Sequence, residues 1–158
     1  MMKAAVIRAA GGLEGSQDRE PPDPRTAKRP STDPYKGLGL NRSELFTRQG
    51  YSPNVKFPRI LGIEAVGLVE SAPGNQFRKG DKVPTAMGGL DRDFDGGYAE
   101  YTSVPVVHVQ AVKTELPWET LGALPEMLQA AWGSLFKSLR LEKQERLESW
   151  RCCCIICG

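Results

Sequence analysis

The side chains able to do chemistry in this chain are few and widely spaced. The single histidine, His108, stands apart from other polar motifs, and one imidazole rarely defines a site, so we expect an ordinary surface or hydrogen-bonded histidine. Glu64 falls inside the apolar run ILGIEAVGLV at 60–69, where an unpaired buried carboxylate would be costly, and we expect it to be structural. Asn41 follows a glycine turn, a position where asparagine serves as a turn residue or a helix N-cap.

The cysteines are confined to the last seven residues, as Cys152, Cys153, Cys154 and Cys157. Adjacent cysteines cannot easily all face one metal ion, and no second pair stands at zinc-ribbon spacing. We therefore interpret this segment as an aberrant tail, with a zinc or redox function as the alternative that elemental analysis would reveal. No disulfide framework spans the body of the chain, which agrees with a reducing compartment.

Composition excludes several classes of partner. Lys and Arg number 21 against 19 Asp and Glu, a formal net charge of +2, so no broad basic face for nucleic acid or anionic membrane is indicated. The longest apolar stretch falls well short of the roughly 20 residues that a bilayer requires. We expect a cytoplasmic protein that binds neither nucleic acid nor membrane.

Apolar periodicity predicts which elements position these residues. Short strands are expected over 3–8, 60–69, after the turn at 77–81, and over 96–104, with a short helix in 39–50 that Gly50 ends. Helical spacing follows over 118–124 and 125–139 and continues toward 147. Between them, 13–36 holds five prolines and no Val, Ile, Phe or Met, so we expect a disordered loop without strands.

An ordered set of motifs carries a family resemblance: GLNRSELFTRQG at 39–50, FPRILGIEAVGLVE at 57–70, FRKGDKV at 77–83, GGYAEY at 96–101 and ETLGALPEMLQAAWGSL at 119–135. The set resembles the N-terminal, GroES-like alcohol dehydrogenase domain of the zinc-free, quinone-oxidoreductase-like medium-chain dehydrogenases/reductases. It implies a mainly β fold with C-terminal helices, an incomplete GroES-like barrel whose Rossmann domain is absent. The implied divisions are a catalytic-type domain at 1–112, a helical connector at 113–146 and the Cys-rich tail at 147–158.

The resemblance also implies a site. The zinc-dependent branch has a Cys at the position of Asn41 and Gly-His-Glu where this chain has Gly62, Ile63 and Glu64, so no zinc is expected. It implies that Asn41, Met127 and Ala130 contact the cofactor, which is NADP in intact relatives, and that Glu64 is structural, paired with an arginine. Many relatives carry Thr at the position of Ala130.

We accordingly predict a fragment of an NADP-dependent quinone or enone oxidoreductase, inactive by itself, because no GxGxxG fingerprint is present to hold a dinucleotide strongly. Intact relatives would take a small carbonyl or quinone substrate. The alternative is a non-enzymatic interaction module that pairs with full-length relatives. Helices at 118–146 that lack their partner domain are expected to self-associate.

The proline-rich segment invites one more hypothesis. The family would place two strands between Gly12 and Gly37, and synonymous codons for 13–36 exist that read SRVLKIENRQIPEPPNGQVLIRIK one base later. Likewise ESWRCCCIICG at the end can be coded to read NRGGVAASSVG, a glycine-rich turn of the kind that cradles a pyrophosphate. We hypothesise that 13–36 and 147–158 are products of compensating frame changes, which the nucleotide sequence would test.

Overall fold

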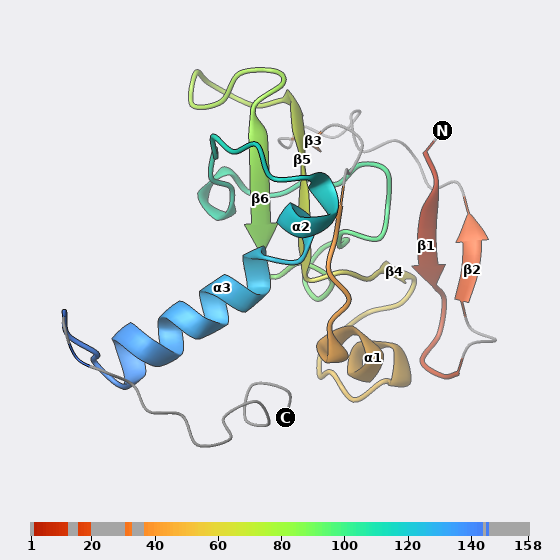
Figure 1. The fold of residues 1–158 in the computed structure, drawn as a ribbon. Coiled ribbons are helices and arrows are strands. Elements are labelled where there is room, and N and C mark those ends of the chain that lie inside the picture. Colours follow the sequence, from red (N-terminus) through yellow and green to blue (C-terminus); the bar gives the residue numbers. More distant parts are fainter. Residues whose placement is uncertain (1, 13–15, 20–30, 33–36, 144, 146–158) are drawn as a thin grey trace.

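The computed structural model describes residues 2–12, 16–19, 31–32, 37–143 and 145 (Figure 1). Its strands form two separate antiparallel sheets of three. In the first, β1 (Ala4–Ile7) lies between β2 (Ser16–Arg19) and β4 (Arg59–Ile60); in the second, β5 (Glu64–Ser71) lies between β3 (Ser31–Thr32) and β6 (Lys82–Ala86). We expected a mainly β barrel with C-terminal helices. The described residues form small sheets together with helices.

The apolar run at 60–69 serves both sheets instead of forming one strand. β4 ends at Ile60 and β5 begins at Glu64, with Gly62 between them at φ 111°, a conformation that only glycine adopts freely. A Cβ on Gly62 would also collide with the backbone of Gly97 and Tyr98. The Gly62 backbone therefore lies close against the chain at Gly97 and Tyr98, and Glu64 lies at the point where the chain enters the second sheet.

The prediction that 13–36 contains no strand is wrong at two places. β2 pairs with β1 from Ala4 opposite Arg19 to Ile7 opposite Ser16, and β3 pairs with β5 at Ser31 and Thr32. Strand pairing uses backbone groups, so an available edge on β1 or β5 can recruit a segment of low strand propensity. The rest of the predicted loop, 13–15, 20–30 and 33–36, lies outside the described residues, as does the tail at 147–158.

The strand expected over 96–104 is also wrong, because this segment is an irregular chain that touches β1 at one bridge. The bridge joins Ala4 and Ala99, and the Ala5 amide donates to the Tyr98 carbonyl at 2.9 Å. Gly96 lies so close to the Leu61 and Gly62 carbonyls that a Cβ would not fit. The alternation seen in the sequence instead places Tyr98, Ala99 and Tyr101 against the core cluster Met2, Ala4 and Ile60.

The helices follow the predicted order. α1 (Arg42–Gln49) has Asn41 as its N-cap and ends at Gly50, whose φ of 88° makes it a left-handed C-cap. α2 (Trp118–Gly122) precedes α3 (Pro125–Trp132), which continues as the π-helix η4 (Gly133–Ser138). The helix was expected to continue toward 147, but η4 ends at Ser138, and Arg140 has a non-helical φ of 53°. Figure 1 shows α3 and η4 (blue) extending away from the strands.

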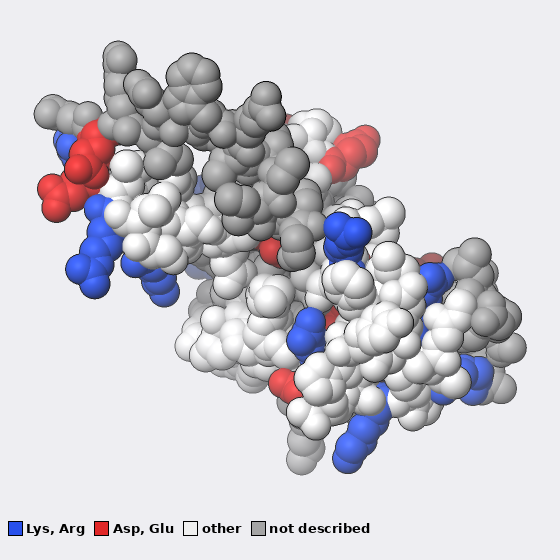
Figure 2. Space-filling view, turned by 90° about the horizontal axis from the view of Figure 1, so that it is seen from below, with Lys and Arg blue, Asp and Glu red and all other residues white. Residues whose placement is uncertain are grey.

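Burial is deepest in β5, in which Ala65 and Val66 are completely buried. Val83 of β6, Leu90 and Val104 are also buried. None of the helices in the described ranges is long and apolar enough to span a bilayer. On the face shown in Figure 2, Lys and Arg side chains stand singly or in small groups among uncharged residues.

Candidate functional site

Glu64 is the residue on which the candidate site is built. Its side chain is 2% exposed, and its two carboxylate oxygens accept different donors: the Asn41 amide Nδ2 at 2.8 Å and the backbone N–H of Glu126 at 2.9 Å. The second donor belongs to the first turn of α3, where free amides and the helix dipole favour a negative charge. Glu64 therefore joins the start of α1 to the start of α3 through the first residue of β5.

Asn41 has the local role of helix N-cap that the sequence suggested, and its contact with a cofactor stays a prediction. It is the N-cap of α1, with an extended backbone at φ −115° and ψ 148°, and its own N–H donates to the Glu44 carboxylate at 2.6 Å. This is the reciprocal bond of a capping box, so the helix start is fixed locally. Its side-chain amide is then directed to Glu64. Asn41 is thus a polar group held in place from two sides.

No arginine of the described residues pairs with Glu64, contrary to the expectation. An amide and a helix N-terminus donate the hydrogen bonds that this buried carboxylate requires. Space for this arrangement comes from Gly39, where a Cβ would overlap Oε1 of Glu64. The motif GLGLN at 37–41 thus contains a glycine required by the site, a signal that sequence reasoning did not use.

Glu44 is a second buried carboxylate, and sequence reasoning missed it. It is 3% exposed, and it accepts hydrogen bonds from the Ile63 amide at 2.9 Å and the Tyr98 hydroxyl at 2.5 Å as well as from Asn41. Burial, followed by the bond to Glu44, raises the pKa of Tyr98 above its usual range, so the phenol remains a donor. The spacing of Asn41 and Glu44 matches a capping box, which is the signal that could have indicated it.

Asp91 is the third buried carboxylate and the least satisfied. It is fully buried with φ 65°, and Nε of Arg92 lies 3.9 Å away. Neither of its oxygens accepts a hydrogen bond of good geometry within the described part of the chain, although the Gly62 amide is near enough to lower its pKa. Burial and then the charge of Glu44 raise the pKa of Asp91 to about 6, against smaller opposing effects of Arg92, the Gly62 amide and Arg59. In sequence Asp91 reads as an ordinary loop residue.

Met127 and Ala130, the other two residues that the resemblance assigns to the cofactor, lie on α3. Met127 is 50% exposed, while Ala130 is partly buried. Both follow the Glu126 amide that Glu64 holds, so one carboxylate fixes the helix that carries them and also orients Asn41. Their contact with a cofactor stays a prediction.

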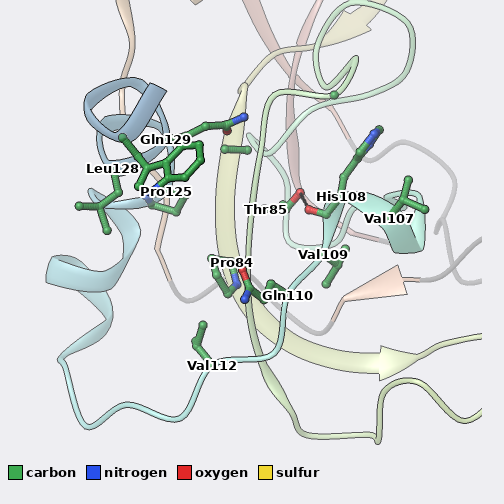
Figure 3. A pocket seen from close by; sticks show the side chains of 13 residues that line it. Pro84, Thr85, Val107, His108, Val109, Gln110, Val112, Pro125, Leu128 and Gln129 are labelled. Carbon is green, nitrogen blue, oxygen red and sulfur yellow. Dashed lines mark hydrogen bonds between the residues drawn. The ribbon is translucent and has the colours of Figure 1, made fainter. Parts of the chain in front are cut away.

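A groove of about 910 Å³ runs between β6, the segment 106–112 and α3. Figure 3 shows Pro125, Leu128 and Gln129 of α3 on one side and Thr85, His108 and Val109 on the other. Met127 and Ala130 are not among its lining residues, because they occupy another face of α3. The groove is therefore separate from the contacts that the resemblance implies.

His108 was expected to be an ordinary surface or hydrogen-bonded histidine, and in the structure it is partly buried. Its ring packs over Gly88, where a Cβ would collide with Nδ1, and this nitrogen is buried without a hydrogen-bond partner within the described ranges. Its backbone carbonyl accepts from the Thr85 hydroxyl at 3.0 Å, which fixes the segment against β6. No other residue of acid or base character lines the groove, so His108 is a packing residue here.

The donor chemistry of these residues does not suit a metal or a whole dinucleotide. No three His, Cys, Asp or Glu residues of the described ranges are grouped as metal ligands. Every described strand pair is antiparallel, whereas a pyrophosphate cradle is built where a parallel strand turns into a helix. The described residues therefore supply a rigid polar wall, Asn41 and Glu64 beside α3, but no phosphate loop.

Comparison with known proteins identifies the family to which this chain belongs. Residues 35–114 match the alcohol dehydrogenase GroES-like domain family, and the chain belongs to that family. The matched range contains Asn41, Glu44, Glu64, Asp91 and Tyr98 and ends just before α2. The homologues are quinone-oxidoreductase-like members of the medium-chain dehydrogenases/reductases, which confirms the resemblance drawn from the sequence motifs.

Two curated relatives illustrate this. The acryloyl-coenzyme A reductase of Sulfurisphaera tokodaii is 28% identical over 162 residues, covering 88% of this chain and 47% of that protein. YhfP of Bacillus subtilis, named for the quinone oxidoreductases, is 44% identical over 50 residues, 32% of this chain and 15% of that protein. The chain spans about half the length of the reductase it matches.

Solved structures give the same picture. A crystal structure of an NAD-dependent alcohol dehydrogenase superposes with a TM-score of 0.79 at 26% identity, covering 91% of this chain and 49% of that one. Mycobacterial Rv1454c complexed with NADPH superposes with a TM-score of 0.73 at 25% identity, covering 90% of this chain and 43% of that one. The fold of the described residues is therefore that of the first half of such oxidoreductases.

Proposed function

We propose that this chain is the substrate-side half of an NADP(H)-dependent oxidoreductase that reduces quinones or carbonyl-conjugated alkenes, and that it has no such activity by itself. The observation that carries the proposal is the Glu64 junction. One buried carboxylate orients the Asn41 amide and fixes the start of α3, the two places that the family resemblance assigns to the nicotinamide. Rigid placement of this kind is what a protein contributes when the cofactor performs the hydride chemistry.

The reaction class rests on the relatives. One is named an acryloyl-coenzyme A reductase, whose name describes reduction of an alkene next to a carbonyl, and another is named for quinones. The choice of NADP(H) is supported by the relative solved with NADPH. Neither reaction needs zinc when the protein holds the carbonyl by hydrogen bonding, which agrees with Asn41 at a position where the zinc-dependent branch has a ligand.

A direct test joins this chain to a second half. Residues 1–146 would be fused to the part of the Sulfurisphaera tokodaii reductase that follows the matched region, and NADPH oxidation would be followed with acryloyl-coenzyme A and with a simple quinone. We expect the fusion to turn over at least one of them and the chain by itself to neither bind NADPH in a fluorescence titration nor oxidise it. Saturable NADPH binding by the isolated chain would contradict the proposal.

Within the active fusion, Asn41→Ala tests the assigned polar contact. Loss of an oriented donor to a developing oxyanion commonly costs 10²-fold or more in kcat, so we expect a fall of about that size. The matched control is Gln49→Ala, an exposed position at the other end of α1, which should leave kcat within about twofold. Equal effects of the two substitutions would remove Asn41 from the site.

The second candidate is a non-enzymatic module that pairs with full-length relatives. It is favoured by the apolar side chains that α3 and η4 expose. If it holds, the isolated chain should co-purify with an intact homologue and alter its NADPH affinity, and the fusion should stay inactive.

A further inference from the structure

A second pocket, of about 390 Å³, lies beside α1. Its volume is within the range of small-molecule sites. Asn41 and Glu64 do not line it, so it is separate from the contacts described above. One wall is formed by α1 with the residues that follow it, and the other by the loop that carries Arg92. The lining residues are Ser43, Phe46, Tyr51, Ser52, Pro53 and Arg92.

Arg92 brings a positive charge to this pocket, and its guanidinium is held in place. Nη2 donates to the Ser43 hydroxyl at 3.0 Å, and Nε lies 3.9 Å from Oδ1 of Asp91. The Arg92 side chain is nevertheless 44% exposed, so part of the guanidinium faces solvent. A guanidinium oriented in advance loses less side-chain entropy when it binds an oxyanion. The Ser43 hydroxyl, which accepts from Arg92, can donate its own hydrogen to the same oxyanion.

The acidic groups near Arg92 limit the charge of a ligand. Asp91 is completely buried, so it lies on the protein side of the guanidinium. The Asp93 carboxylate lies over Gly89, where an added Cβ would come within 2.7 Å of Oδ2. One guanidinium next to a buried carboxylate favours a ligand with a single negative charge, because Asp91 would repel the second charge of a phosphate dianion at short range.

The aromatic wall of the pocket fits a planar ligand. The Phe46 and Tyr51 rings lie 6.3 Å apart, edge to face, and are 41% and 75% exposed as residues. Two rings at an angle form a corner in which a third ring can stack on one and meet the edge of the other. The Ser52 hydroxyl bonds to the hydroxyl of the buried Thr47 at 2.8 Å, which fixes the chain after Tyr51 against α1.

We propose that this pocket binds a small aromatic carboxylate, whose ring packs against Phe46 and Tyr51 and whose carboxylate accepts hydrogen bonds from Arg92 and Ser43. Charge strengthens the bond from the guanidinium, and the two rings select an aromatic ligand over an aliphatic one. Because the pocket is open and the ligand small, binding is weak, with a Kd of about 0.1–10 mM. This inference does not depend on the proposed enzymatic function, since it concerns binding by the chain as it is.

Titration of the full chain with benzoate, followed by the NMR chemical shifts of its backbone amides, measures the binding. We expect saturable shifts at the residues that line the pocket. Benzamide has the same ring without the charge, and cyclohexanecarboxylate has the charge without the aromatic ring, so each should bind at least about fivefold more weakly than benzoate. Benzamide binding as tightly as benzoate would contradict the role of Arg92, and equal binding of cyclohexanecarboxylate would contradict that of the two rings.

Substitution of Arg92 tests the same contact from the side of the protein. Arg92→Gln should weaken benzoate binding about tenfold or more and change benzamide binding little, because only the charge-assisted bond is lost. The matched control is Arg78→Gln, an exposed position in the turn between β5 and β6, which Figure 1 shows at the other end of these strands from α1. It should bind benzoate as the natural chain does.

Circular dichroism melting of each variant establishes that it is folded, and the three ligands compared on the natural chain test the proposal without any substitution. Benzoate that shifts no amide of the pocket, or that binds Arg92→Gln and the natural chain equally, would overturn it.

Discussion

At the scale of single residues, the most informative feature is that three buried carboxylates differ in their hydrogen bonding. Glu44 and Glu64 receive donors from backbone amides, Asn41 and Tyr98, whereas Asp91 receives none of good geometry within the described ranges. A buried ion without hydrogen bonds lowers stability, and Asp91 also holds a left-handed backbone that favours glycine or asparagine. Asp91 is thus expected to lower the stability of the folded state, whereas the buried carboxylates Glu44 and Glu64 are hydrogen-bonded.

Asp91→Asn is predicted to stabilise the chain in a manner that depends on pH. Since the pKa of Asp91 rises from 3.8 to about 6 on folding, the folded state holds the proton more tightly, so the contribution of Asp91 to stability is intact below about pH 4 and is lost as pH rises through 6. Above pH 7 we expect the variant to be more stable by about 2–3 kcal/mol, with little difference near pH 4. Urea unfolding at both pH values measures this.

Asp93→Asn is the control, an exposed carboxylate in the same loop, and it should change the unfolding free energy by less than about 0.5 kcal/mol at either pH. Asp91→Gly should stabilise as well, because glycine removes the charge and suits φ 65°. A gain from Asp91→Asn that is the same at both pH values would show that backbone strain, and not the charge, is responsible.

At the scale of elements, two glycines have opposite effects on stability: Gly39 is required by packing, whereas Gly133 is not. Gly39 makes room for the Glu64 carboxylate, and an added Cβ would displace that group from Asn41 and α3. Gly133 lies between α3 and η4 with helical φ and ψ of −60° and −43°, and a Cβ there would meet nothing within 4 Å. The first glycine is required by packing, while the second only weakens a helix.

We therefore predict that Gly133→Ala stabilises the chain by about 0.5–1 kcal/mol, through its higher helix propensity and the restricted unfolded state. Gly39→Ala should destabilise it by about 1–3 kcal/mol, because Glu64 would lose buried hydrogen bonds. Thermal melting followed by circular dichroism compares the two. Destabilisation by Gly133→Ala would mean that the helix through 133 is not formed in the isolated chain.

At the scale of the whole molecule, the two strands in the proline-rich segment bear on the hypothesis of a shifted reading frame. The shifted peptide has LKIE at the positions of β2 and VL at those of β3, so its β-patterned runs coincide with the backbone pairing to β1 and β5. The frame-change hypothesis stays a prediction, because the codons were chosen to favour a match with the two strands that the family has in this segment.

A chain in which 13–36 is replaced by SRVLKIENRQIPEPPNGQVLIRIK is predicted to unfold at a higher urea concentration than the natural chain, since β-branched and apolar residues would extend both sheets. We expect a gain of at least about 2 kcal/mol. The control carries the same 24 residues in scrambled order. If the scrambled and ordered peptides stabilise equally, the frame-shift hypothesis loses its structural support.

The sequence alone predicted the family, the helix positions and the polar residues Asn41 and Glu64, because turn residues and apolar spacing act over a few neighbours. It did not reveal that Glu44 and Asp91 are buried, that the run at 60–69 divides between two sheets, or that 96–104 is irregular and meets β1 at a single bridge. Those outcomes depend on contacts between residues far apart in the chain, as when Ile63 donates to Glu44, 19 residues away, or Glu126 donates to Glu64, 62 residues away. Local sequence patterns do not specify such long-range contacts. Only the tertiary structure therefore decides which carboxylates are hydrogen-bonded and which helix face stays exposed.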